Sequence, residues 1–414
     1  MNDRRRVVVT GMGLVTSLGL TPQEVWDNML AARCGISRLS TSDHADFKTH
    51  NGGVLAGQAL AEALKAAKIT PADRAVDMAL LVSKQALEHS RLATGDSPGL
   101  PQELPVIFGT GIGSSESYFS SMKALFEKGV RGIRPTTVPR CMTNAVSAQV
   151  SMKFRLTGPN YVIVSACTSS TNAIGSCFRL IKDGYYDRAL CGGTDSPFDL
   201  FAFGAWNNLG VMSRNPDPAK ACRPFDAARD GTILGEGAGA MVLESLESAR
   251  TRGAGVLAEI CGFGESSDAE HITTPSADGQ ARAMRMALSS AGMQPTDVGF
   301  INAHGTATKA NDECEARSIR TVFGEQTGRI PVASSKSFFG HLLGASGIAE
   351  TIVTVMGLRA GRVPPNLGLE NKDPACDLLL VGSQPMELQS PVATKNSFGF
   401  GGNNAVLVLR RWQE

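Results

Sequence analysis

The sequence predicts an α/β protein whose sheets are largely buried. Short runs rich in β-branched residues alternate with longer segments of helical period along the whole chain, which is typical of strands that are covered by helices. The 414 residues are 42% hydrophobic and 19% charged, so the chain has enough apolar material for a large core. The sequence shows neither a tandem repeat nor a linker rich in Ser, Pro or charge.

Strands are expected where apolar, β-branched residues cluster in short runs. The basic start of the chain and the run that follows also resemble a signal peptide, but Gly11, Gly13 and Gly19 interrupt the apolar stretch, which favours a buried first strand. The expected strands are residues 6–10, 106–109, 161–164, 189–192, 240–244, 298–302, 331–334, 392–396 and 405–409.

Three helices have readable starts or a clear apolar period. Thr21, Pro22 and Glu24 match a capping box with proline at the first helical position. Residues 73–89 and 278–291 carry apolar side chains at helical spacing. These helices lie between expected strands, as an α/β architecture requires.

The best candidate boundary lies at residues 250–255, after which the alternation of strands and helices restarts. We therefore expect an N-terminal half, 1–253, and a C-terminal half, 254–414, packed as one unit. The most apolar later stretch, near residues 348–358, contains Glu350 and is too short to cross a bilayer of roughly 30 Å. No transmembrane segment is expected.

Composition narrows the possible partners and cofactors. Forty Lys and Arg residues against 39 Asp and Glu leave a formal net charge of +1, so no global field draws the chain to nucleic acid or to an anionic membrane. The nine cysteines are scattered, without a C-x2-C pair, which argues against disulfides and a metal site and favours a reducing, cytoplasmic location. The Gly11-Met-Gly13 motif lacks the third glycine of a dinucleotide fingerprint, so no nicotinamide cofactor is expected.

The segment 161–175 points to a reactive cysteine. A buried strand ends at Ser165 and a helix begins just after Cys167, so the thiol lies at a strand-to-helix elbow. The unpaired amides and the positive end of the helix dipole there lower a thiol pKa and can hold an oxyanion. Cys177, ten residues further along, is interpreted as an ordinary core residue.

Two of the six histidines follow predicted buried strands in glycine-rich segments. His304 stands in Asn-Ala-His-Gly-Thr, and His341 stands in Phe-Phe-Gly-His-Leu. Side chains at such strand ends project into a cleft. Both histidines are therefore candidate partners of Cys167.

Two further features have a structural and a functional interpretation. Lys336, five residues before His341, is either a surface residue or a fixed cation near a reacting anion. Residues 396–404 hold three glycines around Phe398 and Phe400. This segment is either a tight turn between two strands or a mobile gate whose backbone amide approaches a ligand.

Together these motifs resemble the β-ketoacyl-acyl carrier protein synthases, condensing enzymes of the thiolase superfamily, and most of all the KAS II group and the ketosynthase subunits of type II polyketide systems. The motifs occur in the family's order over essentially the whole chain. They are Ser165-Ala-Cys167-Thr-Ser, Arg223-Pro-Phe-Asp-Ala-Ala-Arg-Asp-Gly231, Gly235-Glu-Gly-Ala-Gly239, Asn302-Ala-His304-Gly-Thr306, Lys336-Ser-Phe-Phe-Gly-His341 and Phe398-Gly-Phe400-Gly-Gly402. The resemblance implies a thiolase-like fold, in which two similar α/β halves form a layered αβαβα core.

The resemblance also implies a role for each site residue. Cys167 would take the acyl chain from carrier-protein phosphopantetheine as a thioester, and the amides of Cys167 and Phe400 would form the oxyanion hole. His304 and His341 would bind the malonyl thioester carbonyl and promote loss of CO2, with no cofactor beyond the carrier's phosphopantetheine. Further implied roles are support of the histidine pair by Lys336, structural support by Glu350 and Asp312, and substrate contacts by Thr306, Thr308, Ile112, Phe398 and Phe400, with Ile112 at a dimer interface.

Departures from the family pattern leave the pathway open. The fatty-acid enzymes usually have Ala-Thr-Ser after the cysteine and Gly-Gly-Thr-Asn at the end of the last motif, where this chain has Thr168-Ser169-Ser170 and Gly401-Gly402-Asn403-Asn404. The Cys-Thr-Ser run and the pair Asn311-Asp312 look more like type II polyketide ketosynthase subunits. Of the basic cluster that the fatty-acid enzymes carry before the Asp77 helix, only Arg74 is present, so the identity of the carrier protein stays open.

Three functions are weighed against these motifs. The first is a condensing enzyme that extends an acyl or polyketide chain by two carbons, either as a homodimer or as a ketosynthase subunit beside a chain-length factor. A non-catalytic chain-length factor is disfavoured because Cys167 and both histidines are present. A cysteine hydrolase would use one Cys–His pair oriented by Asn or Asp, which leaves the second histidine and Lys336 without a role. The sequence does not indicate the length or branching of the acyl substrate.

Overall fold

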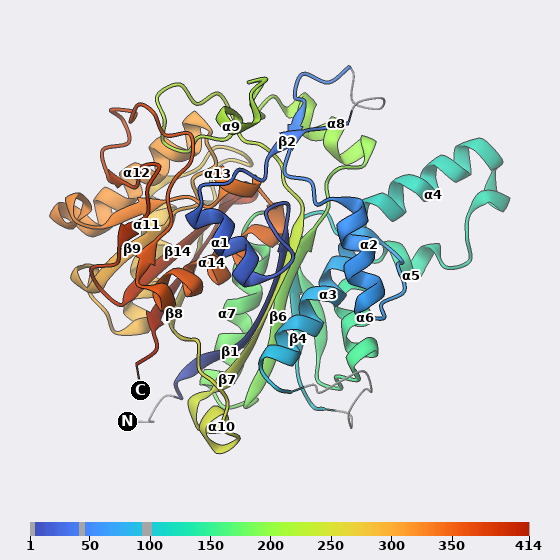
Figure 1. The fold of residues 1–414 in the computed structure, drawn as a ribbon, viewed down its shortest axis with the longest axis horizontal. Coiled ribbons are helices and arrows are strands. Elements are labelled where there is room, and N and C mark those ends of the chain that lie inside the picture. The colour runs from blue at the N-terminus through green and yellow to red at the C-terminus, as the bar shows by residue number, and fades with distance from the viewer. Residues whose placement is uncertain (1–4, 41–45, 93–101, 414) are drawn as a thin grey trace.

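The computed structural model describes residues 5–40, 46–92 and 102–413, and its ribbon shows a large central sheet with helices on both faces (Figure 1). The strands are Val7–Thr16 (β1), Ser37–Arg38 (β2), Asn51–Gly52 (β3), Val106–Gly109 (β4), Asn160–Ile163 (β5), Arg188–Asp195 (β6), Gly237–Ser245 (β7), Ala258–Ser267 (β8), Val298–Asn302 (β9), Pro331–Ala333 (β10), Arg362–Val363 (β11), Leu379–Leu380 (β12), Met386–Glu387 (β13), Val392–Gly399 (β14) and Asn403–Arg411 (β15). The α-helices are Pro22–Leu30 (α1), Gly57–Ala66 (α2), Arg74–His89 (α3), Ser115–Lys128 (α4), Thr137–Cys141 (α5), Ala145–Phe154 (α6), Ser169–Lys182 (α7), Leu200–Leu209 (α8), Pro218–Ala221 (α9), Leu246–Thr251 (α10), Ala277–Ala291 (α11), Lys309–Phe323 (α12), Lys336–Phe339 (α13) and Ser346–Ala360 (α14). Each strand expected from the sequence overlaps an observed strand.

The two halves of the sheet have the same strand order. One half runs β1-β7-β6-β4-β5 and the other runs β8-β15-β14-β9-β10, with β12 added at its edge. When the five strands of each half are numbered in chain order, both halves have the spatial order first, fifth, fourth, second, third. The predicted pair of similar α/β halves is confirmed. The halves join into one continuous sheet because β1 and β8 pair antiparallel, from Val7 opposite Ile260 to Val9 opposite Ala258.

The helices form three layers around the two half-sheets. Helices α7 and α14 lie in the middle and contact each other and strands of both half-sheets. Helix α3 packs on β1 and β7 and carries α6 beside it, whereas α11 packs on β8 and β15 and carries α12. This is the layered αβαβα arrangement that the family resemblance implies. Helix α14 is buried from Ser346 through Leu358, so this part of the middle layer is shielded from water.

The start of α1 follows the predicted capping pattern. Thr21 is the N-cap, and its hydroxyl accepts the Glu24 N–H at 3.1 Å. The Glu24 carboxylate accepts the N–H of Leu20 at 2.8 Å, one residue before the cap. Pro22 occupies the first turn, where its missing N–H leaves no bond unmade.

Strand β8 is absent from the sequence prediction because its residues are unusual for a strand. Gly262 and Gly264 replace the expected β-branched side chains. A Cβ atom on either glycine would lie 2.3 Å from a backbone carbonyl oxygen of α11. The glycines therefore allow α11 to pack directly on the strand, which a propensity-based prediction cannot detect.

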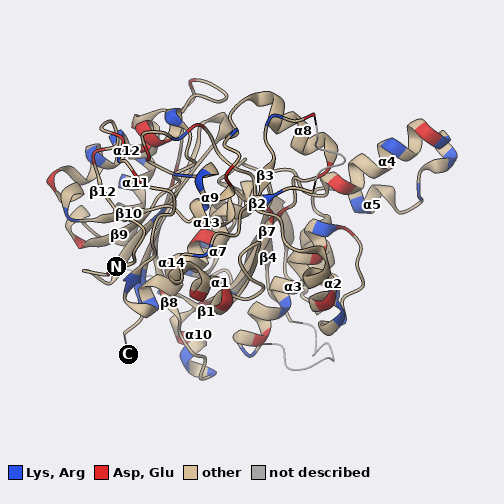
Figure 2. Ribbon diagram, turned by 45° about the horizontal axis from the view of Figure 1, so that its top comes forward, with Lys and Arg blue, Asp and Glu red and all other residues tan. Residues whose placement is uncertain are grey.

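Helices α4 and α5 extend from the body of the protein as an arm (Figure 1). Charged residues of both signs lie on the arm and over the outer helices (Figure 2). The arm also exposes large apolar side chains, and Phe126 is 79% exposed. The others are Tyr118, Met122, Val130, Ile133 and Val138. Within the described part of the chain, each helix is too short or too polar to cross a membrane.

Gly109 sets the distance between β4 and the helix that carries the candidate nucleophile. A Cβ atom at this position would lie 2.2 Å from the backbone of Ser169 and Ser170, in the first turn of α7. Only a glycine allows this close approach of strand and helix. The position of Cys167, which directly precedes this turn, therefore depends on Gly109.

The Gly109→Ala substitution is expected to lower the free energy of unfolding by about 3 kcal/mol, because α7 or β4 must shift to admit the methyl group. Chemical denaturation monitored by circular dichroism measures this loss. Gly57→Ala, at a site where a Cβ atom meets no atom within 4 Å, is the matched control and should change stability by less than about 0.5 kcal/mol. Equal stabilities of the two variants would contradict the close packing.

Candidate active site

Cys167 lies at a sharp turn between β5 and α7. The preceding residue, Ala166, adopts a left-handed conformation with φ of 54°, which is strained for a residue with a side chain. The Cys167 side chain is buried, and the helix begins two residues later. Gly399 of β14 packs against the turn, because a Cβ atom there would lie 3.0 Å from the Cys167 backbone nitrogen. The elbow predicted from the sequence is present.

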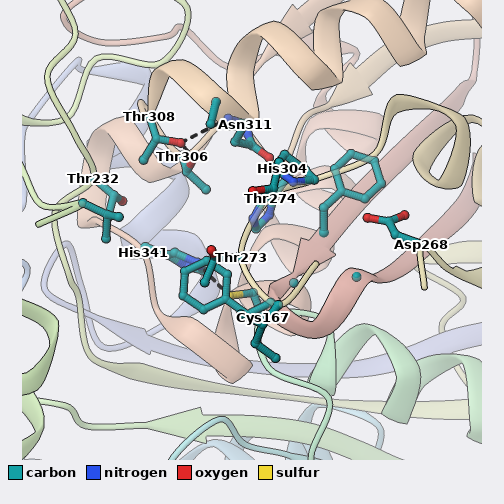
Figure 3. Close-up of a pocket in the computed structure, with 18 of the residues that line it drawn as sticks. Cys167, Thr232, Asp268, Thr273, Thr274, His304, Thr306, Thr308, Asn311 and His341 are labelled. Atoms are coloured by element: carbon teal, nitrogen blue, oxygen red, sulfur yellow. Dashed lines mark hydrogen bonds between the residues drawn. The ribbon is translucent and has the colours of Figure 1, made fainter. Parts of the chain in front are cut away.

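His341 faces the thiol across the cavity. Its Nε2 lies 3.1 Å from Cys167 Sγ, and the two side chains point toward one another in Figure 3. On the other side of the ring, the Leu343 N–H donates to Nδ1 at 3.2 Å, and the Ser346 hydroxyl lies 2.8 Å from the same atom. Because Nδ1 accepts a hydrogen bond, the imidazole proton resides on Nε2 and is directed at the sulfur.

His304 is fixed by Lys336. The Lys336 ammonium lies 3.3 Å from His304 Nδ1 and donates to the His304 carbonyl oxygen at 2.6 Å. It also forms an ion pair of 2.6 Å with Glu350 Oε1. An ammonium group has no lone pair, so Nδ1 must accept and the His304 proton resides on Nε2. The two histidine rings are nearly perpendicular, with centroids 5.4 Å apart and an interplanar angle of 83°.

Burial determines the protonation states of this site. It lowers the pKa of His304 and of His341 well below the usual value, and Lys336 and Lys395 lower both further by charge repulsion. Burial also raises the pKa of the Cys167 thiol to about 11, against the attraction of Lys336. The expectation of a lowered thiol pKa is therefore wrong for the free protein, because desolvation of a thiolate outweighs the helix terminus. At neutral pH the site holds a thiol and two neutral imidazoles.

A thiol and two imidazoles are also the groups that bind zinc. The sulfur and one ring nitrogen of each histidine lie within 4.8 Å of one another. In His304 and His341, however, each Nδ1 faces a hydrogen-bond donor, so each Nε2 keeps its proton. A protonated ring nitrogen has no lone pair for a metal ion. The geometry favours donation of two N–H groups to an oxygen over metal binding.

A cavity of about 280 Å³ opens beside these three residues. Thr306 and Thr308 line it, with their hydroxyl oxygens 2.9 Å apart, and Thr308 also caps α12 (Figure 3). Phe398 packs edge-on against His304, with ring centroids 5.9 Å apart. Further lining residues include Trp206, Thr232, Asp268, Ile272, Thr273 and Phe400.

Phe400 occupies the position expected of a gate. Its backbone amide is close enough to the Cys167 thiol to lower the pKa of that group. Its ring stacks on Trp206, with centroids 5.8 Å apart and an interplanar angle of 16°. Gly401 and Gly402 follow in the left-handed region, with φ of 77° and 73°, which lets the chain turn sharply behind the ring.

The two other predicted site residues lie outside the cavity. Asp312 is buried and accepts the Phe225 N–H at 2.8 Å and an Asn311 amide hydrogen at 3.1 Å, which fits a structural role. Ile112 is 36% exposed, and its N–H donates to Asp195 at 3.0 Å. Its expected place against an acyl chain requires a second subunit, so that role stays a prediction.

Two buried carboxylates that organise the site were missed in the sequence. Glu315 accepts the N–H groups of His304 and Gly305, each at 2.8 Å. Asp195, at the end of β6, accepts the N–H of Gly344 at 2.7 Å, in the loop after His341. Neither belongs to a motif that marks it in the sequence, and both stand among polar neighbours. Lys395 and Trp206 were missed for the same reason.

Comparison with known families identifies the family to which this fold belongs. The model described as the N-terminal domain of β-ketoacyl synthase matches residues 4–249, and the model for the C-terminal domain matches residues 257–370. The chain belongs to the β-ketoacyl synthase family. Its class is therefore that of the condensing acyltransferases, as the motifs indicate.

Similar proteins come from fatty-acid and polyketide systems. The chain is 37% identical over 415 residues to the 3-oxoacyl-(acyl-carrier-protein) synthase 2 of Staphylococcus aureus (strain N315), with 100% of both chains covered. It matches the structure of the ishigamide ketosynthase/chain length factor with a TM-score of 0.90 and 32% identity, over 99% of this chain and 100% of that one. A type II polyketide ketosynthase bound to the hexaketide, in complex with its acyl carrier protein, matches with a TM-score of 0.91 and 27% identity over the same shares.

Alkylation of Cys167 by iodoacetamide is expected to accelerate from about pH 7 to about pH 10, because the thiolate fraction rises until the pH reaches the thiol pKa of about 11. Peptide mass spectrometry after timed quenching measures the rate at this residue. The His341→Leu variant should show a curve of the same shape, since a neutral imidazole does not hold a thiolate. A rate that is flat from about pH 6 to about pH 9 would instead reveal a thiolate–imidazolium pair.

Proposed function

We propose that this protein catalyses the decarboxylative condensation of an acyl group held on Cys167 with a malonyl group held on an acyl carrier protein. The observation that carries this proposal is the pair of neutral imidazoles, whose Nε2–H groups face the same cavity as the thiol. Two N–H donors directed at one oxygen stabilise an enolate without a metal ion.

In the first step the Cys167 sulfur attacks the carbonyl carbon of an acyl thioester. The bond to the carrier's phosphopantetheine sulfur breaks, and the thiol proton of Cys167 passes to that leaving sulfur. The negative charge on the carbonyl oxygen is held by the backbone amides of Cys167 and Phe400. The Phe400 amide lowers the pKa of the Cys167 thiol, which supports its placement beside the reacting atoms.

In the second step a malonyl thioester enters with its phosphopantetheine arm along Thr306 and Thr308. The bond to the carboxylate carbon breaks, CO2 leaves, and its electron pair forms an enolate. The enolate oxygen accepts the Nε2–H groups of His304 and His341. Lys336 keeps the His304 proton on the side of the cavity, because it occupies Nδ1.

In the third step the enolate carbon attacks the carbonyl carbon of the acyl-cysteine. A carbon–carbon bond forms, the bond to the Cys167 sulfur breaks, and one proton from solvent restores the thiol. The carrier then holds a β-ketoacyl chain that is two carbons longer. All atoms balance with one CO2 released per cycle.

A cysteine hydrolase is not supported by this geometry. Its histidine would need an acceptor on Nδ1 that orients the ring and stabilises its charge. Instead the Leu343 N–H donates to His341 Nδ1. An imidazolium is therefore disfavoured, and the second histidine and Lys336 have roles only in the condensing reaction. A non-catalytic chain-length subunit would not require the complete site.

Arg74, the one basic residue found where the fatty-acid enzymes have a cluster, is paired with buried Glu236 at 2.5 Å and is not free to dock a carrier. We propose that a chain of this fold covers the apolar arm and the edge strand β5, where Tyr161 is 41% exposed. A homodimer and a pair with a chain-length factor both fit, in a cytoplasmic setting.

Cys167→Ala is expected to abolish both acyl transfer to the protein and elongation, whereas His304→Ala should still acylate but extend at least about 100-fold more slowly. Intact-mass spectrometry of protein and carrier, with acyl chains of graded length and malonyl-carrier, separates these two steps. Cys177→Ala, in the helix that follows Cys167, is the matched control and should retain both. Elongation by Cys167→Ala would contradict the proposal. Acylation of the wild type without extension would indicate that a partner subunit or a specific carrier protein is missing from the assay.

The paired substitutions Phe126→Asp and Val130→Asp on the arm are expected to convert a two-chain assembly into single chains, because charge disfavours burial of this surface. Sedimentation velocity measures the change in mass. Met286→Asp, an exposed apolar position on α11, should leave the assembly intact. An unchanged mass for the arm variant would show that another surface forms the contact.

A further inference from the structure

A second lysine lies in the buried network behind the histidine pair. Lys395, on β14, is fully buried, and its Nζ lies 2.8 Å from Glu350 Oε2 as an ion pair. The other carboxylate oxygen, Oε1, holds Lys336 at 2.6 Å. One glutamate therefore bridges two buried lysines. The condensation steps described for the family motifs use only Lys336.

Lys395 also connects the strand of the gate to the helix of the nucleophile. Its Nζ donates to Ser397 Oγ, on the same strand. The Ser397 hydroxyl lies 2.7 Å from Thr171 Oγ1, one turn beyond Cys167 in α7. Strand β14 ends at Gly399, directly before Phe400. Lys395 is therefore bonded directly to the strand of the gate and, through Ser397, to the helix that follows Cys167.

A buried lysine at this place needs a reason beyond packing. Burial lowers the pKa of Lys395, Glu350 raises it and Lys336 lowers it. Removing an ammonium group from water is costly even when it is paired, and an apolar side chain of similar volume is often more stable. Lys395 nevertheless shares the one carboxylate of Glu350 with Lys336.

We propose that Lys395 is a second positioning lysine for the decarboxylative condensation, an inference that rests on the proposed function. It holds Glu350 by one oxygen, so that the other stays directed at Lys336, and Lys336 in turn fixes the proton of His304 toward the cavity. Lys395 also adds a positive charge near both histidines. This charge favours the enolate and keeps both imidazoles neutral.

The charged groups around the histidine pair come from every packed element. They are Lys336 on α13, Lys395 on β14, Glu350 on α14, Glu315 on α12 and Asp195 on β6, with the Cys167 thiol opposite. Loss of Lys395 removes a positive neighbour. The pKa of both histidines should then rise, and the acid limb of the kcat profile should move to higher pH.

The Lys395→Met variant tests the proposal. The kcat of malonyl decarboxylation should fall about tenfold or more, while the KM for malonyl-carrier stays within about twofold. The acid limb should move to higher pH, and Cys167 should still be acylated. Lys372→Met removes a lysine from an exposed ion pair with Asp377, so this control should change none of these values. Lys395→Gln, which keeps a polar end group, serves if the methionine variant fails to fold.

A second experiment uses the Glu350→Gln background. Without the carboxylate, Lys336 and Lys395 are two buried cations with no charge between them. Adding Lys395→Met should then raise kcat above that of the single Glu350→Gln variant, which is the opposite of its effect in the wild type. A residue that only supports packing gives losses of the same sign in both backgrounds.

The measurements distinguish a positioning role of Lys395 from a packing role and from failure of the proposed function. A shifted acid limb together with the reversed effect in Glu350→Gln supports the proposal. An unchanged kcat and pH profile in Lys395→Met and Lys395→Gln would overturn it. A loss of activity that matches a lowered stability, without a shift of the pH profile, would also overturn it. If the wild type does not extend a carrier-bound chain, the proposed function itself fails, and Lys395 has no reaction to serve.

Discussion

The carboxylate of Glu350 is the interaction on which the active site depends. It lies in the middle layer, on a helix that is otherwise buried among apolar residues, and it holds Lys336 and Lys395 at 2.6 and 2.8 Å. Charges so far from water persist only with partners at close range. Because Lys336 also binds the ring and the carbonyl of His304, the compensation of buried charge and the orientation of a catalytic hydrogen bond are the same set of contacts.

The exclusion of water from the site sets the protonation states of its reacting groups. In water an imidazole is divided between two charge states near neutral pH and a thiol ionises near its usual pKa. Here burial keeps both histidines neutral and raises the pKa of the Cys167 thiol to about 11. The thiol and the two imidazoles therefore enter the reaction uncharged. Negative charge develops only after the substrate has bound, on a substrate oxygen that is surrounded by fixed N–H donors. The low dielectric around this oxygen makes each donor more effective.

Much of this structure could be predicted from the sequence, and the failures have physical causes. Cys167, His304 and His341 were found because each follows a β-branched run, and strand ends of an α/β fold meet at one edge. Strand β8 was missed because its glycines serve the packing of α11 rather than strand propensity. Lys395 gave no signal, since its buried position depends on a glutamate that lies 45 residues earlier in the sequence. The thiol pKa was predicted in the wrong direction because a sequence shows a helix start but not the loss of water around it.

The most direct test of this account is the protonation state of the two active-site histidines. Nitrogen NMR of protein labelled with ¹⁵N in histidine, with His304→Ala and His341→Ala used for assignment, reads the state of each ring nitrogen at pH 7. The account predicts two neutral rings, each with its proton on Nε2, in the acyl-free protein. An imidazolium signal from either residue, or a proton on Nδ1, would contradict it.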